Sequence, residues 1–140
     1  MLFRSLQPFL SLCFSKEYSE REMRALVMGR GGLVAYLGTN SAVEVENRIA
    51  RGDLQARGVY QAMAYQIAKE IGAMATVLEG RLHAIVLAGG LAASAMLVEW
   101  IRQRVAFLAP VVVYAGEDEM GALAAAALRV IRGEEAALEY

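Results

Sequence analysis

The sequence predicts a mixed α/β protein, a single domain over residues 1–140 with a small, mostly parallel sheet and flanking helices. Short apolar runs rich in branched side chains, at residues 83–90 and 109–116, each precede a helical pattern. This alternation is typical of parallel sheets. Before them, residues 54–78 place apolar side chains at spacings of three and four, which predicts one long core helix.

Composition supports a packed core and excludes several classes of protein. Hydrophobic residues make up 57% of the chain and charged residues 21%, unlike a disordered protein. A formal net charge of −1 gives no positive field to hold nucleic acid or an acidic lipid surface. With one cysteine, Cys13, and one histidine, the chain has no internal disulfide and no Cys/His zinc cluster. We expect a cytoplasmic location.

Two apolar stretches could be mistaken for membrane or export segments. Residues 82–98 are uncharged but shorter than a bilayer span requires, and Gly89 and Gly90 divide them into strand, turn and helix. The N-terminal stretch resembles a secretory signal only until Gln7 and Pro8 interrupt it, and no small-residue cleavage site follows. We therefore expect neither a membrane anchor nor export.

A short helix is predicted after Ser19, because Glu22 completes a capping box with that serine. The glycine cluster at 29–32 is expected to end it. The run LVAYL, residues 33–37, is short and apolar, so we interpret it as a brief strand. Three predicted strands would form a small sheet with exposed edges.

A polar turn, GTNS, follows at residues 38–41. Its side chains could contact a phosphate or cap the next helix, and from the residues alone capping is the preferred interpretation. That helix is expected to stop at Gly52. Further helices are expected from about Ser94 to Phe107 and over the last apolar run, which ends at Gly133.

The clearest indication of a ligand site is HAIVLAGGLAAS, residues 83–94, where a strand ends in Gly89 and Gly90 and turns into a helix. Two positions without Cβ atoms let a flat or charged ligand approach the main chain, and the free N–H groups of the helix favour anions. The pattern lacks the G-x-G-x-x-G spacing of dinucleotide sites. A tight turn without a ligand explains the same spacing, so both interpretations stay open.

Acidic residues follow the second predicted parallel strand, in GEDEM at residues 116–120. Glu117, Asp118 and Glu119 therefore lie where open parallel sheets bind ligands. A carboxylate here could hold Mg²⁺ through water beside a triphosphate. Acidic residues in a first helical turn also stabilise the helix dipole without any metal.

Four segments from about Leu12 to Tyr140 resemble the butyrate kinase group of the acetate kinase family, whereas residues 1–11 diverge. They are GRGGLVAYLGTN, VYQAMAYQIAKEIGAMA, IVLAGGLA and APVVVYAGEDEMGALAAAALRVIRGEEAALEY. The family belongs to the actin-like ATPase superfamily, so the resemblance implies a ribonuclease-H-like C-terminal domain. It also implies phosphoryl transfer between ATP and a short-chain carboxylate, with butanoate and ATP giving butanoyl phosphate and ADP.

The resemblance implies substrate contacts as well, because Gly89–Ser94 matches the family's adenosine-binding motif and the acidic stretch matches one that supplies a carboxylate near the metal. The expected ATP or ADP contacts are Gly38, Thr39, Asn40, Gly89, Gly90, Leu91, Ala92 and Ser94, and the expected Mg²⁺ ligands are Asp118 and Glu119. The family's catalytic Asp and Arg and its first phosphate-binding hairpin lie in an N-terminal part without a match here. No catalytic residue is therefore assigned to these 140 residues.

The sequence departs from the family pattern at five positions. The turn that usually reads G-T-N-D-x-R has Ser41 and Val43 in place of the acid and the base. A usual Asp, Thr and aromatic residue are replaced by His83, Ala88 and Ala93. Each lost charge-assisted hydrogen bond costs about 1.5–3 kcal/mol, so two losses weaken nucleotide binding about a hundredfold or more. We expect the isolated chain to bind ATP weakly or not at all and to be inactive.

An alternative is a stand-alone interaction or dimerisation module that has this fold and no catalysis. Relatives of this kind associate through their C-terminal domains, and an apolar surplus suits an interface. The expected partners are a nucleotide, a short-chain carboxylate in a complete enzyme, and either a second copy of the chain or a complementing N-terminal domain.

Overall fold

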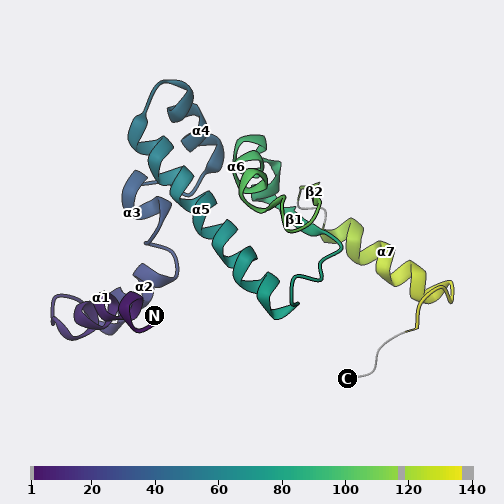
Figure 1. The fold of residues 1–140 in the computed structure, drawn as a ribbon, viewed down its shortest axis with the longest axis horizontal. Helices are drawn as coiled ribbons and strands as arrows, with labels where there is room; N and C mark the ends of the chain where they lie inside the picture. The colour runs from purple at the N-terminus through teal and green to yellow at the C-terminus, as the bar shows by residue number, and fades with distance from the viewer. Residues whose placement is uncertain (1, 117–118, 137–140) are drawn as a thin grey trace. The chain divides into compact units, whose positions relative to one another are not determined.

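The computed structural model describes residues 2–116 and 119–136. The chain divides into two compact units, Met1–Ala73 and Met74–Tyr140. Figure 1 shows the order of the elements along the chain.

Every regular element that the structure describes in the first unit is a helix. The helices are α1 (Leu2–Phe14), α2 (Glu20–Val27), α3 (Leu33–Leu37), α4 (Ala42–Ala50) and most of α5 (Leu54–Val77). Val45 of α4 and Tyr60 of α5 are fully buried. The Tyr60 hydroxyl donates to Glu46 Oε1 at 3.2 Å, which ties α5 to α4. These two helices therefore supply the best-shielded part of this unit's core.

Three predicted features of this unit are confirmed. Ser19 Oγ accepts the amide of Glu22 at 3.3 Å, and the Glu22 carboxylate accepts the amide of Ser19 at 2.8 Å, so the capping box forms as expected. Helix α4 ends before Gly52, whose φ of 91° requires the left-handed region that glycine tolerates best. Helix α5 covers all but the last residue of the predicted range.

Residues 33–37 form α3, so the prediction of a strand there is wrong. An apolar run of five residues fits either structure, because it is too short to show a period. Two side chains from later in the chain bond the carbonyls at the end of this helix and so favour it over a strand. Arg48 Nη1 donates to Leu37 O at 2.9 Å, and Gln55 Nε2 donates to Tyr36 O at 3.4 Å. The turn at 38–41 therefore follows a helix.

The second unit contains the predicted parallel sheet. Strand β1 (Ile85–Gly89) pairs in parallel with β2 (Val111–Ala115), with Ile85 opposite Val111 and Gly89 opposite Ala115. In the part of the chain that the structure describes, the sheet has these two strands. It is one strand smaller than predicted, since residues 33–37 are helical.

The connection from β1 to β2 passes through a short 3₁₀ helix, η1 (Gly90–Ala93), and α6 (Ala95–Val105). Helix η1 contacts both strands and α6. One face of α6 is buried, through Leu97, Val98, Ile101 and Val105. The predicted helix from Ser94 is confirmed, with Ser94 as the cap that precedes it.

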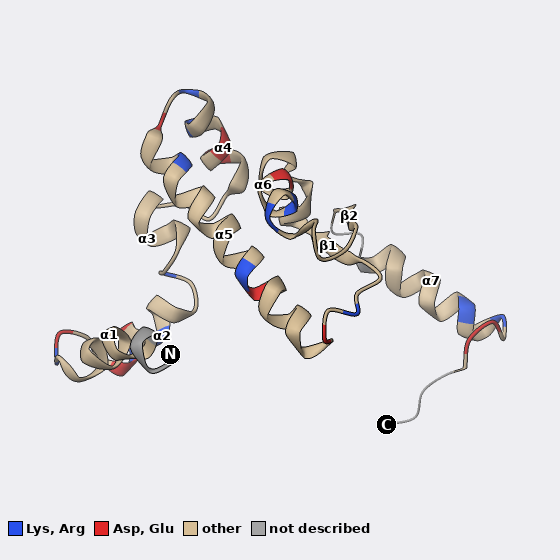
Figure 2. Cartoon of the chain, in the orientation of Figure 1, with Lys and Arg blue, Asp and Glu red and all other residues tan. Residues whose placement is uncertain are grey.

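Helix α7 (Glu119–Ile131) follows β2 and ends before Gly133 as predicted. After its first residue it contains one charged residue, Arg129, so most of it is tan in Figure 2. Its apolar side chains are largely exposed, with Met120 at 77% and Ile131 at 79%. Over residues 2–116 and 119–136, none of the helices combines the length and the hydropathy that crossing a bilayer requires.

Candidate functional site

The carboxyl ends of the two parallel strands meet at a pair of glycines. Gly89 lies opposite Ala115 in the sheet register and also forms an isolated bridge with Gly116. Gly116 directly precedes the acidic residues 117–119. The glycine turn and the point where the acidic stretch begins therefore lie at the same edge of the sheet, which is the edge where open parallel sheets bind ligands.

The backbone at Gly89 explains why glycine is needed there. Its φ of 85° and ψ of −173° lie in a region that is essentially restricted to glycine. None of the described atoms lies within 4 Å of a Cβ built on this residue. The space beside the main chain at Gly89 is therefore open, so a ligand atom has room to approach the backbone there.

The predicted residues after Gly89 form one continuous turn, but their side chains differ in role. The Ala92 side chain is buried, whereas Leu91 is exposed. Ser94 is buried, and its Oγ accepts the amide of Leu97 at 3.0 Å, which caps α6. The part of this turn most open to a ligand is therefore the main chain at Gly89–Leu91.

The two predicted metal ligands are only partly covered by the structure. Asp118 lies outside the described residues, and Glu119 begins α7. Within residues 2–116 and 119–136, no group of three or more His, Cys, Asp or Glu residues is arranged to hold a metal ion. Hydrated Mg²⁺ takes few protein ligands, so an acidic pair at this edge would fit its chemistry. Binding by Asp118 and Glu119 stays a prediction.

The predicted turn Gly38–Asn40 lies in the first unit. Gly38 ends α3 with a φ of 74°. Thr39 Oγ1 accepts the amide of Ser41 at 3.1 Å and donates to Glu44 Oε2 at 2.7 Å. Ser41 Oγ accepts the amide of Glu44 at 3.3 Å, which confirms that Ser41 caps α4. The Thr39 hydroxyl is thus already used within the turn, beside a carboxylate.

The sequence did not predict an ion pair between a residue of α4 and the residue before α5, whose arginine also bonds the residue before this turn. Arg48 donates from Nε and Nη2 to Asp53 Oδ2, at 2.9 and 2.8 Å, and from Nη1 to Leu37 O. Asp53 Oδ1 accepts the amide of Ala56 at 2.9 Å and so caps α5. The amide of Ala56, and after it the guanidinium of Arg48, lower the pKa of Asp53 below its ordinary value of 3.8. The only signal in the sequence is an aspartate directly before the long helix.

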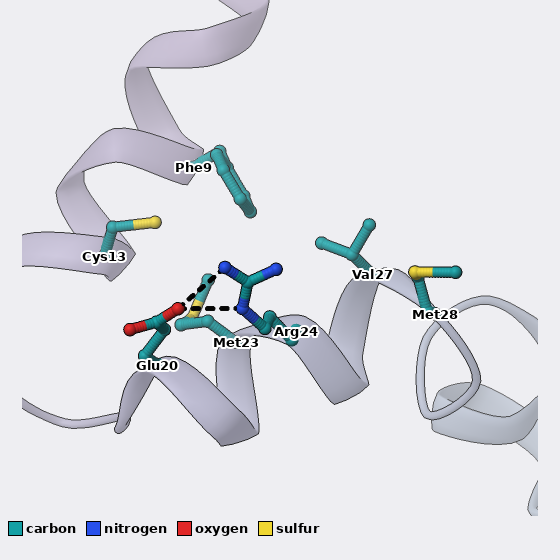
Figure 3. Close-up of a pocket in the computed structure, with 7 residues that line it drawn as sticks. All are labelled: Phe9, Cys13, Glu20, Met23, Arg24, Val27 and Met28. Carbon is teal, nitrogen blue, oxygen red and sulfur yellow. Dashed lines mark hydrogen bonds and ion pairs between the residues drawn. The ribbon is translucent and has the colours of Figure 1, made fainter.

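A hollow of about 370 Å³ between α1 and α2 was also not predicted (Figure 3). Most of its lining is apolar. Glu20 and Arg24 also line it, and they form an ion pair in which Arg24 Nη2 lies 2.7 Å from Glu20 Oε1. The residues that line it are Phe9, Cys13, Glu20, Met23, Arg24, Val27 and Met28. It contains none of the predicted ligand-binding residues.

The parallel strand pair, the connection through η1 and α6 and the flanking helices define a mixed α/β protein with an open glycine turn at the carboxyl edge of its sheet. Comparison with known protein families matches residues 9–123 to the Acetokinase family. The chain therefore belongs to the acetokinase family, and its fold is consistent with the actin-like ATPase fold of that family. Membership supports a carboxylate kinase, a class that in general uses ATP and Mg²⁺.

Proposed function

We propose that this chain is the C-terminal, nucleotide-binding portion of a butyrate kinase, which interconverts butanoate and ATP with butanoyl phosphate and ADP. Family membership supports a carboxylate kinase. The narrower assignment to butyrate rests on the resemblance of the segments IVLAGGLA and APVVVYAGEDEMGALAAAALRV to that group.

The observation that supports this proposal best is the bridge between Gly89 and Gly116 at the carboxyl edge of the sheet. A flat adenosine can lie against a main chain without Cβ atoms, and the acidic residues after Gly116 begin beside it. Phosphoryl transfer depends mostly on positioning and on charge stabilisation. In this proposal Gly89–Leu91 binds and orients the nucleotide, and Asp118 and Glu119 hold hydrated Mg²⁺, which neutralises phosphate charge when bound.

The chain by itself is expected to bind nucleotide weakly. The family's acid and base after the G-T-N turn are absent, and Ser41 caps a helix instead. Thr39 Oγ1 donates to the Glu44 carboxylate, which places a negative charge beside a turn that would otherwise meet phosphate. Weak binding of Mg-ADP and no turnover are therefore the expected properties of the isolated chain.

Amide ¹H–¹⁵N spectra of the chain, titrated with Mg-ADP, test the nucleotide site. We expect the resonances of Gly89, Gly90 and Leu91 to shift progressively, while Gly58 on α5 stays unchanged. Isothermal titration should then give a dissociation constant well above the low micromolar range. Unchanged resonances at Gly89–Leu91, or shifts confined to other residues, would contradict the proposal.

A hydroxylamine trap for acyl phosphate tests the reaction and the acid. The chain alone, with ATP, Mg²⁺ and butanoate, should form no hydroxamate. When a complementing N-terminal domain of a butyrate kinase is added, hydroxamate should form faster from butanoate than from acetate. Equal or faster formation from acetate would overturn the assignment to butyrate while leaving a carboxylate kinase in place.

A second candidate function, an interaction or dimerisation module, is favoured by the exposed apolar side chains of α7. Leu123 is 65% exposed, and Met120 and Ile131 are more exposed still. Burying such side chains contributes about 1.5–3 kcal/mol each. Light scattering across micromolar concentrations tests this function: association that a Leu123→Glu substitution abolishes would support it, and a clean monomer would rule it out.

A further inference from the structure

The hollow between α1 and α2 has the size and the lining of a small-molecule site. Its volume is about 370 Å³, within the range of about 300–1,000 Å³ that is usual for such sites. Met23 is buried, whereas Phe9, Val27 and Met28 around it are exposed to water. Apolar side chains that gather at a hollow and stay uncovered are typical of a binding surface. The lining therefore indicates a ligand with an apolar part.

The same lining favours a flexible aliphatic chain. Met23 and Met28 are unbranched thioethers, which adjust to irregular shapes better than branched side chains do. Phe9 and Cys13 come from α1, whereas Met23 and Val27 come from α2, so a chain between the helices contacts both of them. Each methylene group that is buried there strengthens binding through the hydrophobic effect.

Arg24 gives the hollow a cationic group with donors to spare. Its Nε and Nη2 donate to Glu20 Oε1 at 2.8 and 2.7 Å, so the ion pair uses one edge of the guanidinium. The edge formed by Nη1 and Nη2 takes no part in that pair, and its parallel N–H groups match a second carboxylate. Figure 3 shows the guanidinium between Phe9 and Val27, beside the apolar lining. A carboxylate attached to an aliphatic chain therefore fits both parts of the hollow.

The carboxylate of Glu20 opposes such a ligand only weakly. Both side chains of the ion pair are largely exposed, so water screens their charges. The charge of Glu20 is also opposed by the guanidinium that it contacts. Removing either partner should therefore change the affinity for a carboxylate, in opposite directions.

We infer that this hollow binds an aliphatic carboxylate of medium chain length, whose chain contacts Met23, Val27 and Met28 and whose carboxylate bonds the Nη1–Nη2 edge of Arg24. The inference does not depend on the proposed function. The hollow lies in the first unit, whereas the nucleotide is assigned to the second unit.

Methyl spectra of the methionines, recorded on the full chain during titration with octanoate below its micelle concentration, test the apolar part. Met23 and Met28 should shift and saturate. Met120 on α7 is 77% exposed and provides the reference for unspecific contact with an amphiphile. Hexanoate should bind about fourfold more weakly, because it has two methylene groups fewer to bury in an open hollow. Equal responses of Met28 and Met120 would overturn the site.

Opposite substitutions of the ion pair test the carboxylate contact, with octanol as the uncharged reference ligand. Arg24→Gln should weaken octanoate about threefold, and Glu20→Gln should strengthen it by a similar factor. Neither should alter octanol, whereas a loss of folding would weaken both ligands. Arg21→Gln is the matched control, because Arg21 lies on the same helix and does not line this hollow. An unchanged preference for octanoate in Arg24→Gln, or tighter binding of octylamine than of octanoate, would overturn the assignment of the headgroup.

Cys13, the single cysteine of the chain, reports whether the hollow is occupied. Octanoate should slow the reaction of Cys13 with a thiol reagent. Val27→Asp, at an exposed position, should weaken that protection about tenfold, because a charge then lies in the apolar lining. Protection that grows with protein concentration, and that octanoate relieves, would show that a second copy of the chain covers the hollow and would overturn the small-molecule site.

Discussion

Gly89 and Gly116 bridge the carboxyl end of the β1–β2 pair, and both have positive φ angles, 85° and 119°. Each strand therefore leaves the sheet through a conformation that side chains with a Cβ rarely adopt. The two main chains lie against each other there without side chains between them. This arrangement gives the edge of the sheet its open surface and makes it sensitive to single substitutions.

Replacing Gly89 by alanine should destabilise the second unit by about 1–3 kcal/mol, the usual cost of a strained backbone conformation. The cost arises from φ and ψ, because a Cβ at this position meets no described atom within 4 Å. Urea unfolding followed by the fluorescence of Trp100, the single tryptophan, measures it.

Gly58→Ala is the matched control for that substitution. Gly58 lies within α5, and a Cβ there also meets no described atom within 4 Å. The same change should stabilise the chain by about 0.5–1 kcal/mol, because alanine favours helix interiors. Equal effects of the two substitutions would show that Gly89 is not conformationally special.

Leu97→Ala should destabilise the chain by about 2–5 kcal/mol, because it leaves a cavity where the side chain is 1% exposed. Phe107→Ala, just beyond the same helix, removes a larger side chain that is 82% exposed. Its effect should stay within about 0.5 kcal/mol. Thermal unfolding of the two variants distinguishes them, and similar losses would mean that the buried face of α6 is assigned wrongly.

Ser94→Ala should cost about 0.5–2 kcal/mol, since Ser94 Oγ caps α6 by accepting the amide of Leu97. Ser94→Thr retains a hydroxyl and should recover most of the loss. Urea unfolding measured through Trp100 again provides the measurement. A threonine variant as unstable as the alanine variant would indicate that packing around this buried position matters more than the cap.

Asp53 should make the stability of the first unit depend on acidic pH. Its folded-state pKa is lowered, first by the amide of Ala56 and then by the guanidinium of Arg48. The stabilisation is therefore present above the ordinary value of 3.8 and is lost as the pH falls from there through the lower folded-state pKa.

Asp53→Asn tests this pH dependence, because asparagine cannot ionise. The difference in thermal midpoint between the original chain and the variant should be constant near neutral pH and shrink below about pH 4. Circular dichroism at a series of pH values measures it. A difference that stays the same, or grows, toward acid would contradict the role of the Asp53 charge.

Local patterns were enough to predict the elements whose signals lie within a few residues. The capping box of Ser19 and Glu22, the apolar stripe of α5 and the glycine turn after β1 each depend on neighbouring positions. The edge where β1 and β2 end together was also predictable, because parallel strands joined by a helix must end on the same side.

The sequence by itself determined the parallel pair, the long helix and the family resemblance. Only the tertiary structure decided that residues 33–37 are helical and that Arg48 restrains the turn after them. The physical reason is that the interactions at the end of this helix join residues 11 and 19 positions apart in the sequence. A five-residue apolar run fits strand or helix equally well, and its choice depends on side-chain bonds from Arg48 and Gln55, which no local periodicity can reveal.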